Sequence, residues 1–369
     1  MPNLALLLAF SFVACELAAG TTYEMIKEYA GSGFFDDWEY YNNYDNLTNG
    51  DATFVGSGSD LTYIDSNTNR AIMKVDNSST VAYNYKRDTV RIASKDRYDV
   101  GSIWIADMYH VPYGVSAISS PPLDSAVTVF SWPTVLRLAS MAPDWPTGGE
   151  IDTFEGVNLV TMNQMALHTE SGCTQVNPVQ SSTLINSTDC NYEANSNSGC
   201  VVTDPSAASY GARFASSEGG VFVTEYAETG ISIWFFSRSS VPDTISSNSS
   251  TIDTDDLGTP VANWPNGGCN IDKFFSAQSL IFDITLCGDF AGAASVFNET
   301  CSGTCYTDYV IGAASYYDTA YFDVASVRVY SVNGTDTTVS GSGAMRLWDA
   351  KTAAVLGAAG LGAAAWLAI

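Results

Sequence analysis

The segment WPTGGEIDTFEG at residues 145–156 constrains this chain most, because it places three carboxylates in a short stretch beside an aromatic residue. In a β-strand, residues two positions apart share a face, so Glu150 and Asp152 point one way and Glu155 points the other way. A β-bulge at the two residues before Glu155 would absorb the odd spacing and return it to the face of Glu150. The segment therefore predicts a bulged strand that carries three acidic side chains in one row.

Such a row of carboxylates has a defined chemical use. Desolvation and mutual repulsion hold one carboxyl protonated near neutral pH and leave another ionised. Two carboxyls about 5–5.5 Å apart can flank a glycosidic bond, one attacking the anomeric carbon and the other protonating the leaving oxygen. We assign Glu150 as the nucleophile, Glu155 as the acid/base and Asp152 as the group that tunes both. For the bare Glu-x-Asp-x-x-Glu pattern the alternative is a solvated acidic strand, since short motifs match by chance.

The residues around this pattern favour the catalytic interpretation. The stretch GEIDTFEGVN at residues 149–158 resembles the signature of glycoside hydrolase family 16, in its fungal endo-β-1,3(4)-glucanase, or laminarinase-like, branch. Six further segments are similar to blocks of that branch and occur in the same order. They are RDTVRI at 87–92, LHT at 167–169, WFFSR at 234–238, DDLGTP at 255–260, LCGDFAG at 286–292 and AYFDVASVRVY at 320–330. The resemblance implies a retaining endo-β-1,3(4)-glucanase that hydrolyses laminarin-type and also mixed-linkage β-glucans by double displacement.

Composition between the two ends of the chain favours one all-β domain. Residues 21–339 are rich in Tyr, Phe, Thr, Ser, Val and Gly and poor in Lys, Glu and Leu, which predicts many short strands around a sizeable core. No internal repeat, linker or helical stripe divides this region. The pattern alone predicts only an all-β fold. The resemblance implies a β-jelly-roll sandwich of the concanavalin A-like kind, with the acidic strand lining a concave cleft.

The resemblance also implies residues that contact the sugar. Trp145, five residues before the first glutamate of the motif, is the stacking candidate, because pyranose faces are apolar. Phe290 stands where the family usually has Trp, and we assign it to the leaving-group side. His168 and Arg91 match positions that look like cleft contacts in relatives, whereas we interpret His110 as structural. Core packing is the alternative for the two aromatic residues, and structural hydrogen bonding is the alternative for His168 and Arg91.

Both ends of the chain are typical of processing signals. The apolar run at 4–13, followed by small residues at 18–20, predicts a signal peptide at residues 1–20 that is cleaved before Thr21. Residues 340–369 combine small residues, a spacer and an apolar tail, which predicts a GPI-anchor signal that is removed. A single-pass helix is the alternative, but no basic residues follow the tail. We therefore expect a secreted protein held by a GPI lipid on the outer face of the plasma membrane or in the cell wall.

Glycosylation motifs and charge agree with secretion. Six Asn-x-Ser/Thr motifs are candidate glycosylation sites. They begin at Asn46, Asn77, Asn186, Asn248, Asn298 and Asn333. The formal net charge of −25 disfavours nucleic acid and anionic membranes as partners and suits a neutral polysaccharide. We expect a monomer whose partner is β-glucan.

Cysteine usage predicts disulfides rather than a metal site. Of the eight cysteines, Cys15 leaves with the signal peptide, and seven remain in an oxidising compartment. They are Cys173, Cys190, Cys200, Cys269, Cys287, Cys301 and Cys305. We expect six of them to form disulfides, and the sequence leaves the pairing open. No His neighbours them and their spacing suits no zinc site. The chemistry requires no cofactor, although some relatives carry a structural calcium, which we do not place.

One segment departs from the family pattern. After HVPYG at residues 110–114, relatives continue with Cys and a Trp-Pro-aromatic run, whereas residues 115–137 of this chain do not match. The segment begins with Val-Ser, which the splice-donor sequence GTGAGT would encode, so our hypothesis is retained intron sequence or a faulty gene model. A transcript that reads across codons 114–138 without the segment would confirm it. If the segment is genuine, it alters a core strand and the aromatic residues of the cleft.

Three alternative functions stay open at this point. A transglycosylase passes the same covalent intermediate to another glucan end, but GPI-anchored relatives of that kind usually have the tighter Glu-x-Asp-x-Glu spacing. A non-catalytic glucan-binding protein generally loses the acidic residues, which this chain retains. A structural wall glycoprotein could be inactivated by residues 115–137. Product analysis separates them: new reducing ends indicate a hydrolase, longer chains a transferase, and retention without turnover a binding protein.

Overall fold

The computed structural model describes residues 21–114, 134–246 and 249–340. The expected signal peptide, residues 115–133, Asn248 and the expected C-terminal tail from residue 341 lie outside these ranges. Across the described ranges, no helix has both the length and the apolar character that crossing a membrane requires.

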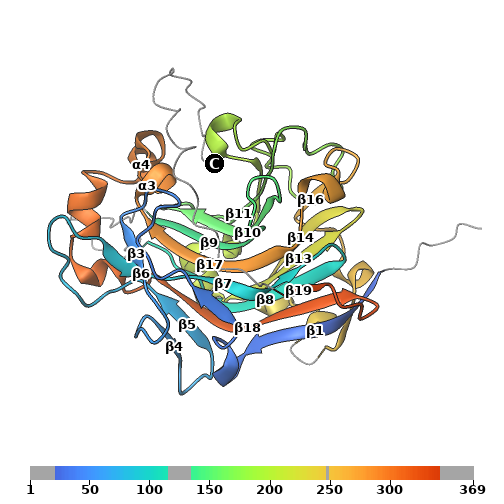
Figure 1. Ribbon diagram of the computed structural model, residues 1–369, viewed down its shortest axis with the longest axis horizontal. Helices are drawn as coiled ribbons and strands as arrows, with labels where there is room; N and C mark the ends of the chain where they lie inside the picture. The colour runs from blue at the N-terminus through green and yellow to red at the C-terminus, as the bar shows by residue number, and fades with distance from the viewer. Residues whose placement is uncertain (1–20, 115–133, 247–248, 341–369) are drawn as a thin grey trace, which may run out of the picture.

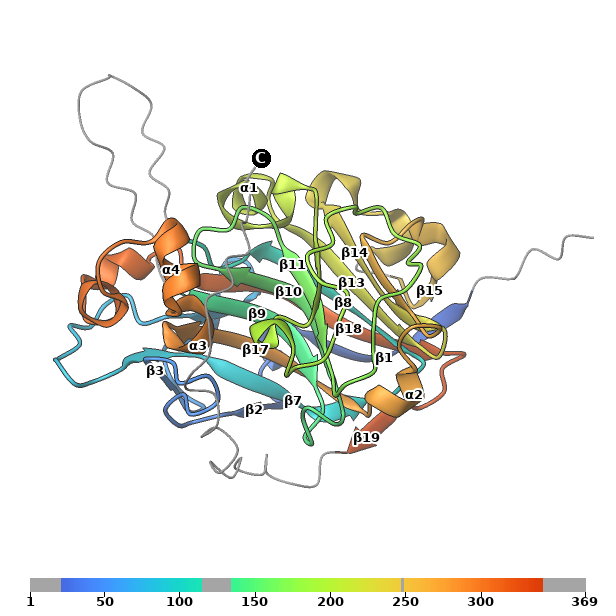
Figure 2. The same cartoon turned by 90° about the horizontal axis from the view of Figure 1, so that it is seen from above.

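Two antiparallel sheets, stacked face to face, form the body of the molecule (Figure 1). The front sheet runs in the order β12 (Cys200–Thr203), β11 (Gln164–His168), β10 (Glu150–Val157), β9 (Thr134–Met141), β17 (Gln278–Leu286), β7 (Arg91–Tyr98) and β19 (Thr338–Ser340), and β2 (Trp38–Tyr40) also pairs with β7. The back sheet runs in the order β15 (Thr251–Asp253), β1 (Thr22–Ala30), β18 (Tyr321–Val332), β8 (Ser102–His110), β13 (Gly220–Ala227), β14 (Gly230–Ser237) and β16 (Ala262–Pro265). Figure 2 shows β10 in the middle of the front sheet, with β11 on one side and β9 on the other.

Shorter elements complete the fold. At one edge of the back sheet, β5 (Ala71–Lys74) pairs with β18 and with β4 (Thr62–Ile64). A separate two-stranded sheet is formed by β3 (Ala52–Phe54) and β6 (Arg87–Thr89), which pair in parallel. The helices are short: α1 (Gly211–Ser216), α2 (Ile271–Phe274), α3 (Gly288–Ala291), α4 (Ala294–Thr300), and the single turns η1 (Gly31–Gly33), η2 (Asn195–Asn197), η3 (Ala207–Ser209), η4 (Arg238–Ser240), η5 (Asp243–Ile245), η6 (Thr254–Leu257), η7 (Cys305–Val310) and η8 (Ala314–Tyr317). The predicted all-β character is therefore confirmed.

The main core lies between the two sheets and is rich in aromatic side chains. Phe154 of β10 packs against Phe222 of β13 and Phe322 of β18, with ring centroids 5.5 and 6.1 Å apart. Phe282 of β17 joins them at 5.3 Å from Phe322. Burial of such rings is the main stabilising contribution in a sandwich of this kind. Because Phe154 reaches this core from β10, the core anchors the strand that carries the acidic motif.

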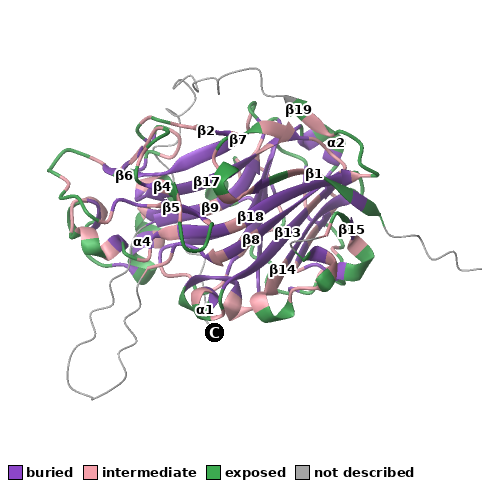
Figure 3. Ribbon diagram, turned by 90° about the horizontal axis from the view of Figure 1, so that it is seen from below, coloured by how far each residue is buried: buried purple, intermediate pink, exposed green. Residues whose placement is uncertain are grey.

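The back sheet is covered on its outer face as well. Val221 and Val223 alternate with the core-facing residues of β13 and pack outward with Trp234. Ile245 of η5 and Leu257 of η6 close over them. Figure 3 shows buried residues along β18, β8, β13 and β14, whereas β1 of the same sheet carries several exposed residues. The outer face of the back sheet is therefore covered over its central strands.

Three disulfides lie within the described residues: Cys173–Cys269, Cys190–Cys200 and Cys287–Cys305. Six cysteines are thus in disulfides, as expected. The pairing joins Cys173 to a residue 96 positions away, which no local pattern indicates. Each bond closes a loop, which limits the conformations of the unfolded chain.

The structure also places parts of the atypical segment and the glycosylation motifs. Residues 134–137 form the first half of β9, paired with both β10 and β17. Within the described residues, four of the candidate asparagines are exposed and Asn77 is half-buried. The exposed ones are Asn46, Asn186, Asn298 and Asn333.

Candidate active site

The acidic motif lies on β10, and this strand contains the predicted bulge. Against β11, Glu150 is opposite His168, but Glu155 is opposite Gln164, so β10 has one residue more than its partner. Against β9, the register shifts between Asp152 and the residue two positions later. Both neighbours therefore show the same extra residue, and the predicted bulge is confirmed.

The bulge directs two consecutive side chains toward the back sheet. Phe154 is fully buried in the core, and the hydroxyl of Thr153 lies 2.6 Å from that of Thr224 on β13. Trp104 of β8 also donates from its Nε1 atom to Thr153 Oγ1, at 3.4 Å. Since two successive residues occupy the core face, Glu155 returns to the face of the front sheet that carries Glu150.

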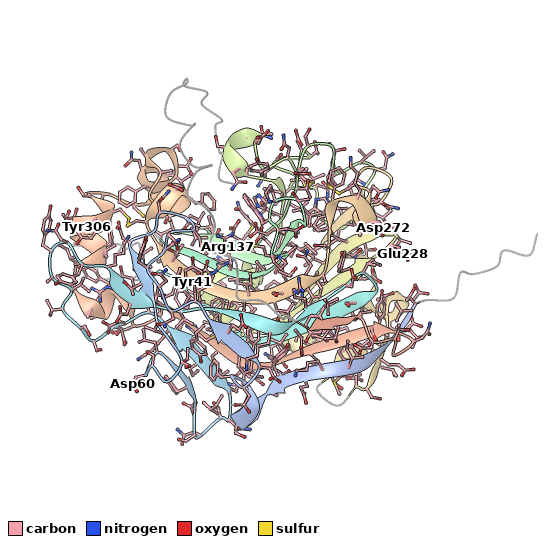
Figure 4. The ribbon with its side chains drawn as sticks, in the orientation of Figure 1. Tyr41, Asp60, Arg137, Glu228, Asp272 and Tyr306 are labelled. Carbon is pink, nitrogen blue, oxygen red and sulfur yellow. A yellow bond between two sulfur atoms is a disulfide. The ribbon has the colours of Figure 1, made fainter. Side chains whose placement is uncertain are left out.

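The three carboxylates share two basic partners. Arg137 of β9 donates from Nη1 to Glu150 Oε1 at 2.9 Å, and its Nε atom lies 3.7 Å from Glu155 Oε1. His168 of β11 places Nε2 at 3.2 Å from Asp152 Oδ2. All three acidic residues are buried, with exposed fractions of 3% for Glu150, 0% for Asp152 and 9% for Glu155. Figure 4 shows Arg137 near the middle of the front sheet.

Trp145 completes the surroundings of Glu150. Its Nε1 atom donates to Glu150 Oε2 at 2.7 Å, so both oxygens of this carboxylate accept a hydrogen bond. The half-buried Trp145 ring also meets the ring of Tyr192 edge-on, with centroids 5.3 Å apart. The loop between Trp145 and β10 depends on Gly149, which has a φ of +73° and leaves only 2.4 Å between an added Cβ and Phe275.

Burial and charge raise the pKa values of both glutamates. Burial, followed by the charge of Asp152, raises the pKa of Glu155 to about 7, although Arg137 and His168 act in the opposite direction. Burial and Asp152 also raise the pKa of Glu150, against the effect of Arg137 at hydrogen-bonding distance and of the Trp145 N–H. Because Glu150 has the shorter contact with the guanidinium, we assign the ionised form to it and the protonated form to Glu155.

His168 is the charged partner of Asp152 at neutral pH. Burial lowers the pKa of His168, but its hydrogen bond to Asp152 and the charges of Asp152 and the two glutamates outweigh this effect and raise that pKa to about 9. Its other ring nitrogen, Nδ1, lies 3.2 Å from Asn197 Oδ1. An imidazolium that donates from both nitrogens fits these two contacts.

Arg91, the other basic residue expected from the resemblance, lies in a different part of the same sheet. It is buried and donates from Nη1 to Asp283 Oδ2 of β17 at 2.8 Å. Asp283 is opposite both Arg91 and Arg137 in the strand register, and Arg137 is opposite Glu155. Basic and acidic residues thus alternate across β7, β17, β9 and β10. In this row, Asp283 and Arg137 lie between Arg91 and Glu155.

Phe290 and Trp145 lie at opposite ends of the acidic row. Phe290 belongs to α3 and is 36% exposed. Its neighbour Ala291 packs against Val157, the last residue of β10, whereas Trp145 precedes the strand and contacts Glu150. The two aromatic residues are therefore on different sides of the carboxylates along β10.

Two charged residues next to the acidic row escaped the sequence analysis. Arg137 and Asp283 are single charged residues within apolar strand sequences, TVLRLASM and QSLIFDITL. A lone charge between buried residues is a signal that could have identified them, because such a charge needs a partner. His110 has the structural setting that we expected: its Nδ1 atom is 2.7 Å from the Tyr321 carbonyl oxygen, and the two rings stack at 3.8 Å. Within the described residues, no cluster of three or more His, Cys, Asp or Glu side chains suits a metal ion.

Comparison with known proteins places this geometry in context. Residues 38–330 match a family model described as the XgeA-like, catalytic GH16 domain. The chain is 37% identical over 315 residues to a probable glycosidase of Schizosaccharomyces pombe, which covers 84% of this chain and 69% of that protein. It is 31% identical over 336 residues to the endo-1,3(4)-beta-glucanase xgeA of Emericella nidulans, covering 86% of this chain and 49% of that one. The chain spans about half the length of most of these curated relatives.

Solved structures agree with the expected fold. Laminarinase 16A from Phanerochaete chrysosporium, determined with two β-glucan molecules in its donor and acceptor sites, has a TM-score of 0.73 and 33% identity, covering 84% of this chain and 100% of that one. An elongating family 16 β-1,3-glucosyltransferase has a TM-score of 0.72 and 30% identity, with the same coverage. The expected β-jelly-roll sandwich of the concanavalin A-like kind is thus confirmed.

Proposed function

Because this chain belongs to glycoside hydrolase family 16, we propose that it is a retaining endo-β-1,3(4)-glucanase that hydrolyses β-1,3-glucans of the laminarin type, and also mixed-linkage glucans. The observation that carries this proposal is the bulged β10, which gathers Glu150, Asp152 and Glu155 on the sheet face that points away from the core, with different partners. The names of the relatives and structural neighbours, which are endo-1,3(4)-β-glucanases and laminarinases, support the substrate class.

The proposed reaction has two displacement steps. In the first step, Glu155 donates its proton to the leaving glycosidic oxygen while Glu150 attacks the anomeric carbon, forming a glycosyl-enzyme. In the second step, Glu155, now ionised, removes a proton from water, which attacks the same carbon and releases Glu150. A pKa of about 7 for Glu155 suits a group that must give up and regain one proton in each cycle.

Asp152 and its partner adjust this proton transfer. The ionised Asp152 raises the pKa of Glu155, while the His168 imidazolium lowers it, so the pair keeps the acid within reach of neutral pH. Arg137 and the Trp145 N–H hold Glu150 in its ionised form until a substrate arrives. Each of these groups stabilises charge in a buried site, where electrostatic interactions are stronger than in water.

The substrate is expected to lie across β10. Trp145 and Phe290, on opposite sides of the carboxylates, are the proposed sugar-stacking residues, with Phe290 on the leaving-group side. His168 is proposed as a further cleft residue, and Arg91 is proposed to act through Asp283 and Arg137 rather than by direct contact with the reacting sugar.

We also propose that the mature protein is secreted, N-glycosylated and GPI-anchored at the cell surface or wall. The support is the apolar run near the N-terminus, the apolar C-terminal tail, and the exposure of Asn46, Asn186, Asn298 and Asn333. We propose a monomer that uses no cofactor in the reaction. A net charge of −25 supports a neutral polysaccharide as the partner and disfavours nucleic acid.

The decisive experiment is laminarin hydrolysis by the secreted protein ending near Ser340, together with its Glu150→Gln and Glu28→Gln variants. Glu28 is an exposed residue of β1 in the back sheet and controls for the loss of one negative charge. The proposal predicts reducing ends from the wild type and from Glu28→Gln, and none above background from Glu150→Gln. A folded wild type that is inactive on laminarin and on mixed-linkage glucan would refute it.

Transglycosylation is the second candidate, because the elongating glucosyltransferase is also a structural neighbour. The same glycosyl-enzyme would then pass to the hydroxyl of a second glucan instead of water. Incubation with a single laminari-oligosaccharide separates the two: shorter products with new reducing ends indicate hydrolysis, and products longer than the starting material indicate transfer.

A further inference from the structure

The bulge in β10 removes two backbone groups from the regular ladder with β11. These are the carbonyl oxygen of Thr153 and the N–H of Glu155, which lie where the register shifts. Buried backbone groups need hydrogen-bond partners, since leaving one unsatisfied is destabilising. A partner for both groups is therefore part of what makes this bulge stable.

Both groups find their partner in one side chain. Asn163, in the connection just before β11, accepts from the Glu155 N–H at Oδ1, at 3.0 Å, and donates from Nδ2 to the Thr153 carbonyl oxygen, at 3.1 Å. The side-chain amide has a donor and an acceptor side by side, as a peptide group does. It thus takes the place of the strand residue that the bulge displaces.

The position of Asn163 is itself determined by a distant loop. Its backbone N–H donates to Ser209 Oγ at 3.0 Å, and its carbonyl oxygen accepts from the Asp204 N–H at 2.9 Å. Ser209 in turn donates to the Ser206 carbonyl oxygen at 2.6 Å. Asn163 is fully buried, with an exposed fraction of 0%. The amide therefore has little freedom to follow a displacement of Glu155.

We propose that Asn163 is a positioning residue for the acid/base: its amide holds the bulge in place and thereby keeps Glu155 on the face that carries Glu150. This inference rests on the proposed function, because it assigns a catalytic consequence to the orientation of Glu155. The side-chain amide of Asn163 bonds to the backbone of the catalytic strand, so it acts through Glu155 and not on the substrate.

The chemistry of the amide makes the inference specific. An aspartate at this position would still accept from the Glu155 N–H, but it would present a second oxygen to the Thr153 carbonyl and bury a charge. An alanine would leave both backbone groups unsatisfied. Both changes free Glu155 to move, whereas Glu150, which precedes the bulge, keeps its contacts with Arg137 and Trp145.

The test separates proton donation from the rest of catalysis by means of the leaving group. Laminarin has a poor leaving group that needs a proton, whereas a 2,4-dinitrophenyl β-laminaribioside leaves without one. The value of kcat/KM reports the first displacement step for each substrate, so the ratio between the two substrates isolates the contribution of the acid. Wild type, Asn163→Ala, Asn163→Asp and Glu155→Ala are compared, with the unfolding temperature of each.

We expect both Asn163 variants to lose about 10- to 100-fold in kcat/KM on laminarin and less than about 3-fold on the aryl glycoside, since a displacement of about 1 Å costs rates of this order. The loss should appear in kcat rather than in KM. Glu155→Ala should show the same selectivity with a larger loss, in the range of about 10²–10⁴-fold. Asn263→Ala in β16 removes a matched amide, which bonds Val179 and Ser232 far from the site, and should change both substrates equally.

The inference is overturned if Glu155→Ala shows leaving-group selectivity but the folded Asn163 variants do not. That result would be an equal loss of kcat/KM on both substrates, or no loss on either. If Asn163→Ala does not fold, Asn163→Asp provides the same comparison, because it retains the acceptor for the Glu155 N–H. If Glu155→Ala itself shows no selectivity, the proposed function fails, and this inference fails with it.

Discussion

Arg137 Nη1 donates a 2.9 Å hydrogen bond to Glu150 Oε1, and this contact connects two strands of the front sheet at the proposed nucleophile. The same guanidinium lies 3.7 Å from Glu155. One half-buried cation therefore stabilises the ionised form of both glutamates, more strongly that of Glu150. The difference in distance is the physical basis for giving the two carboxylates different roles.

Replacing Arg137 with Gln is predicted to lower kcat/KM on laminarin by about 10²-fold or more, because a buried carboxylate loses its charged partner. Arg137 lowers the pKa of both glutamates, so its loss should move both limbs of the pH profile to higher pH. The measurement is kcat/KM as a function of pH. Arg213→Gln, at an exposed position of α1, is the matched control and should leave the profile unchanged. A variant with full activity and unshifted limbs would contradict the assignment.

The wild-type pH profile should reveal the acid directly. Glu155 must be protonated to act on the leaving oxygen, and its pKa is about 7, so kcat/KM is expected to fall as the pH rises through about 7. This alkaline limb should be absent with the dinitrophenyl substrate, which needs no proton. An alkaline limb near pH 9 instead would point to His168, whose pKa is raised to about 9.

His168→Asn tests the ion pair with Asp152. Breaking a buried pair leaves one charge without a partner and is predicted to cost about 3–5 kcal/mol in the free energy of unfolding. The double variant with Asp152→Asn should recover part of that stability, measured in a double-mutant cycle. Because the folded-state pKa of His168 is raised from 6.5 to about 9, its stabilisation is complete below pH 6.5 and is lost as the pH rises through about 9. Additive effects of the two substitutions would argue against a coupled pair.

Asp204 is a buried carboxyl away from the reaction. Burial raises its pKa from 3.8 to about 6, against a hydrogen bond from the Ser206 N–H. The unfolded chain then loses this proton at lower pH than the folded protein does. The free energy of unfolding is therefore predicted to decrease by about 2–3 kcal/mol as the pH rises from about 4 to about 6. Asp204→Asn should remove this part of the pH dependence. Denaturant unfolding of both proteins at pH 4 and pH 7 measures the difference, and parallel pH dependences would exclude a raised pKa.

Several features of the site follow from local sequence. The spacing of Glu150, Asp152 and Glu155 predicts a bulge because side chains in a strand alternate with a period of two, a property of the backbone that needs no tertiary contact. The structure confirms the bulge and the all-β character, both of which were predicted from local sequence. The distinctive order of residues around the motif identified the family, and the oxidising compartment inferred from the chain predicted disulfides.

The partners of these carboxylates could be known only from the tertiary structure. Arg137 meets Glu155 because β9 and β10 pair in one register, and Asp283 meets Arg137 through a strand that lies well over 100 residues later in the chain. The same registers place Arg91, our predicted cleft contact, beside Asp283. Asn163 lies in the connection between β10 and β11, and it reaches the bulge because this connection packs against the loop that contains Ser209.

The sequence by itself determined which groups we propose for the chemistry and which face of the strand they occupy, because alternation and motif spacing are local. The tertiary structure decided the charge state and the orientation of each group, because pKa values and hydrogen-bond partners depend on burial and on side chains from distant strands. Strand registers and disulfide pairs join residues that are far apart in the sequence. They therefore depend on how the two sheets pack around the core between them.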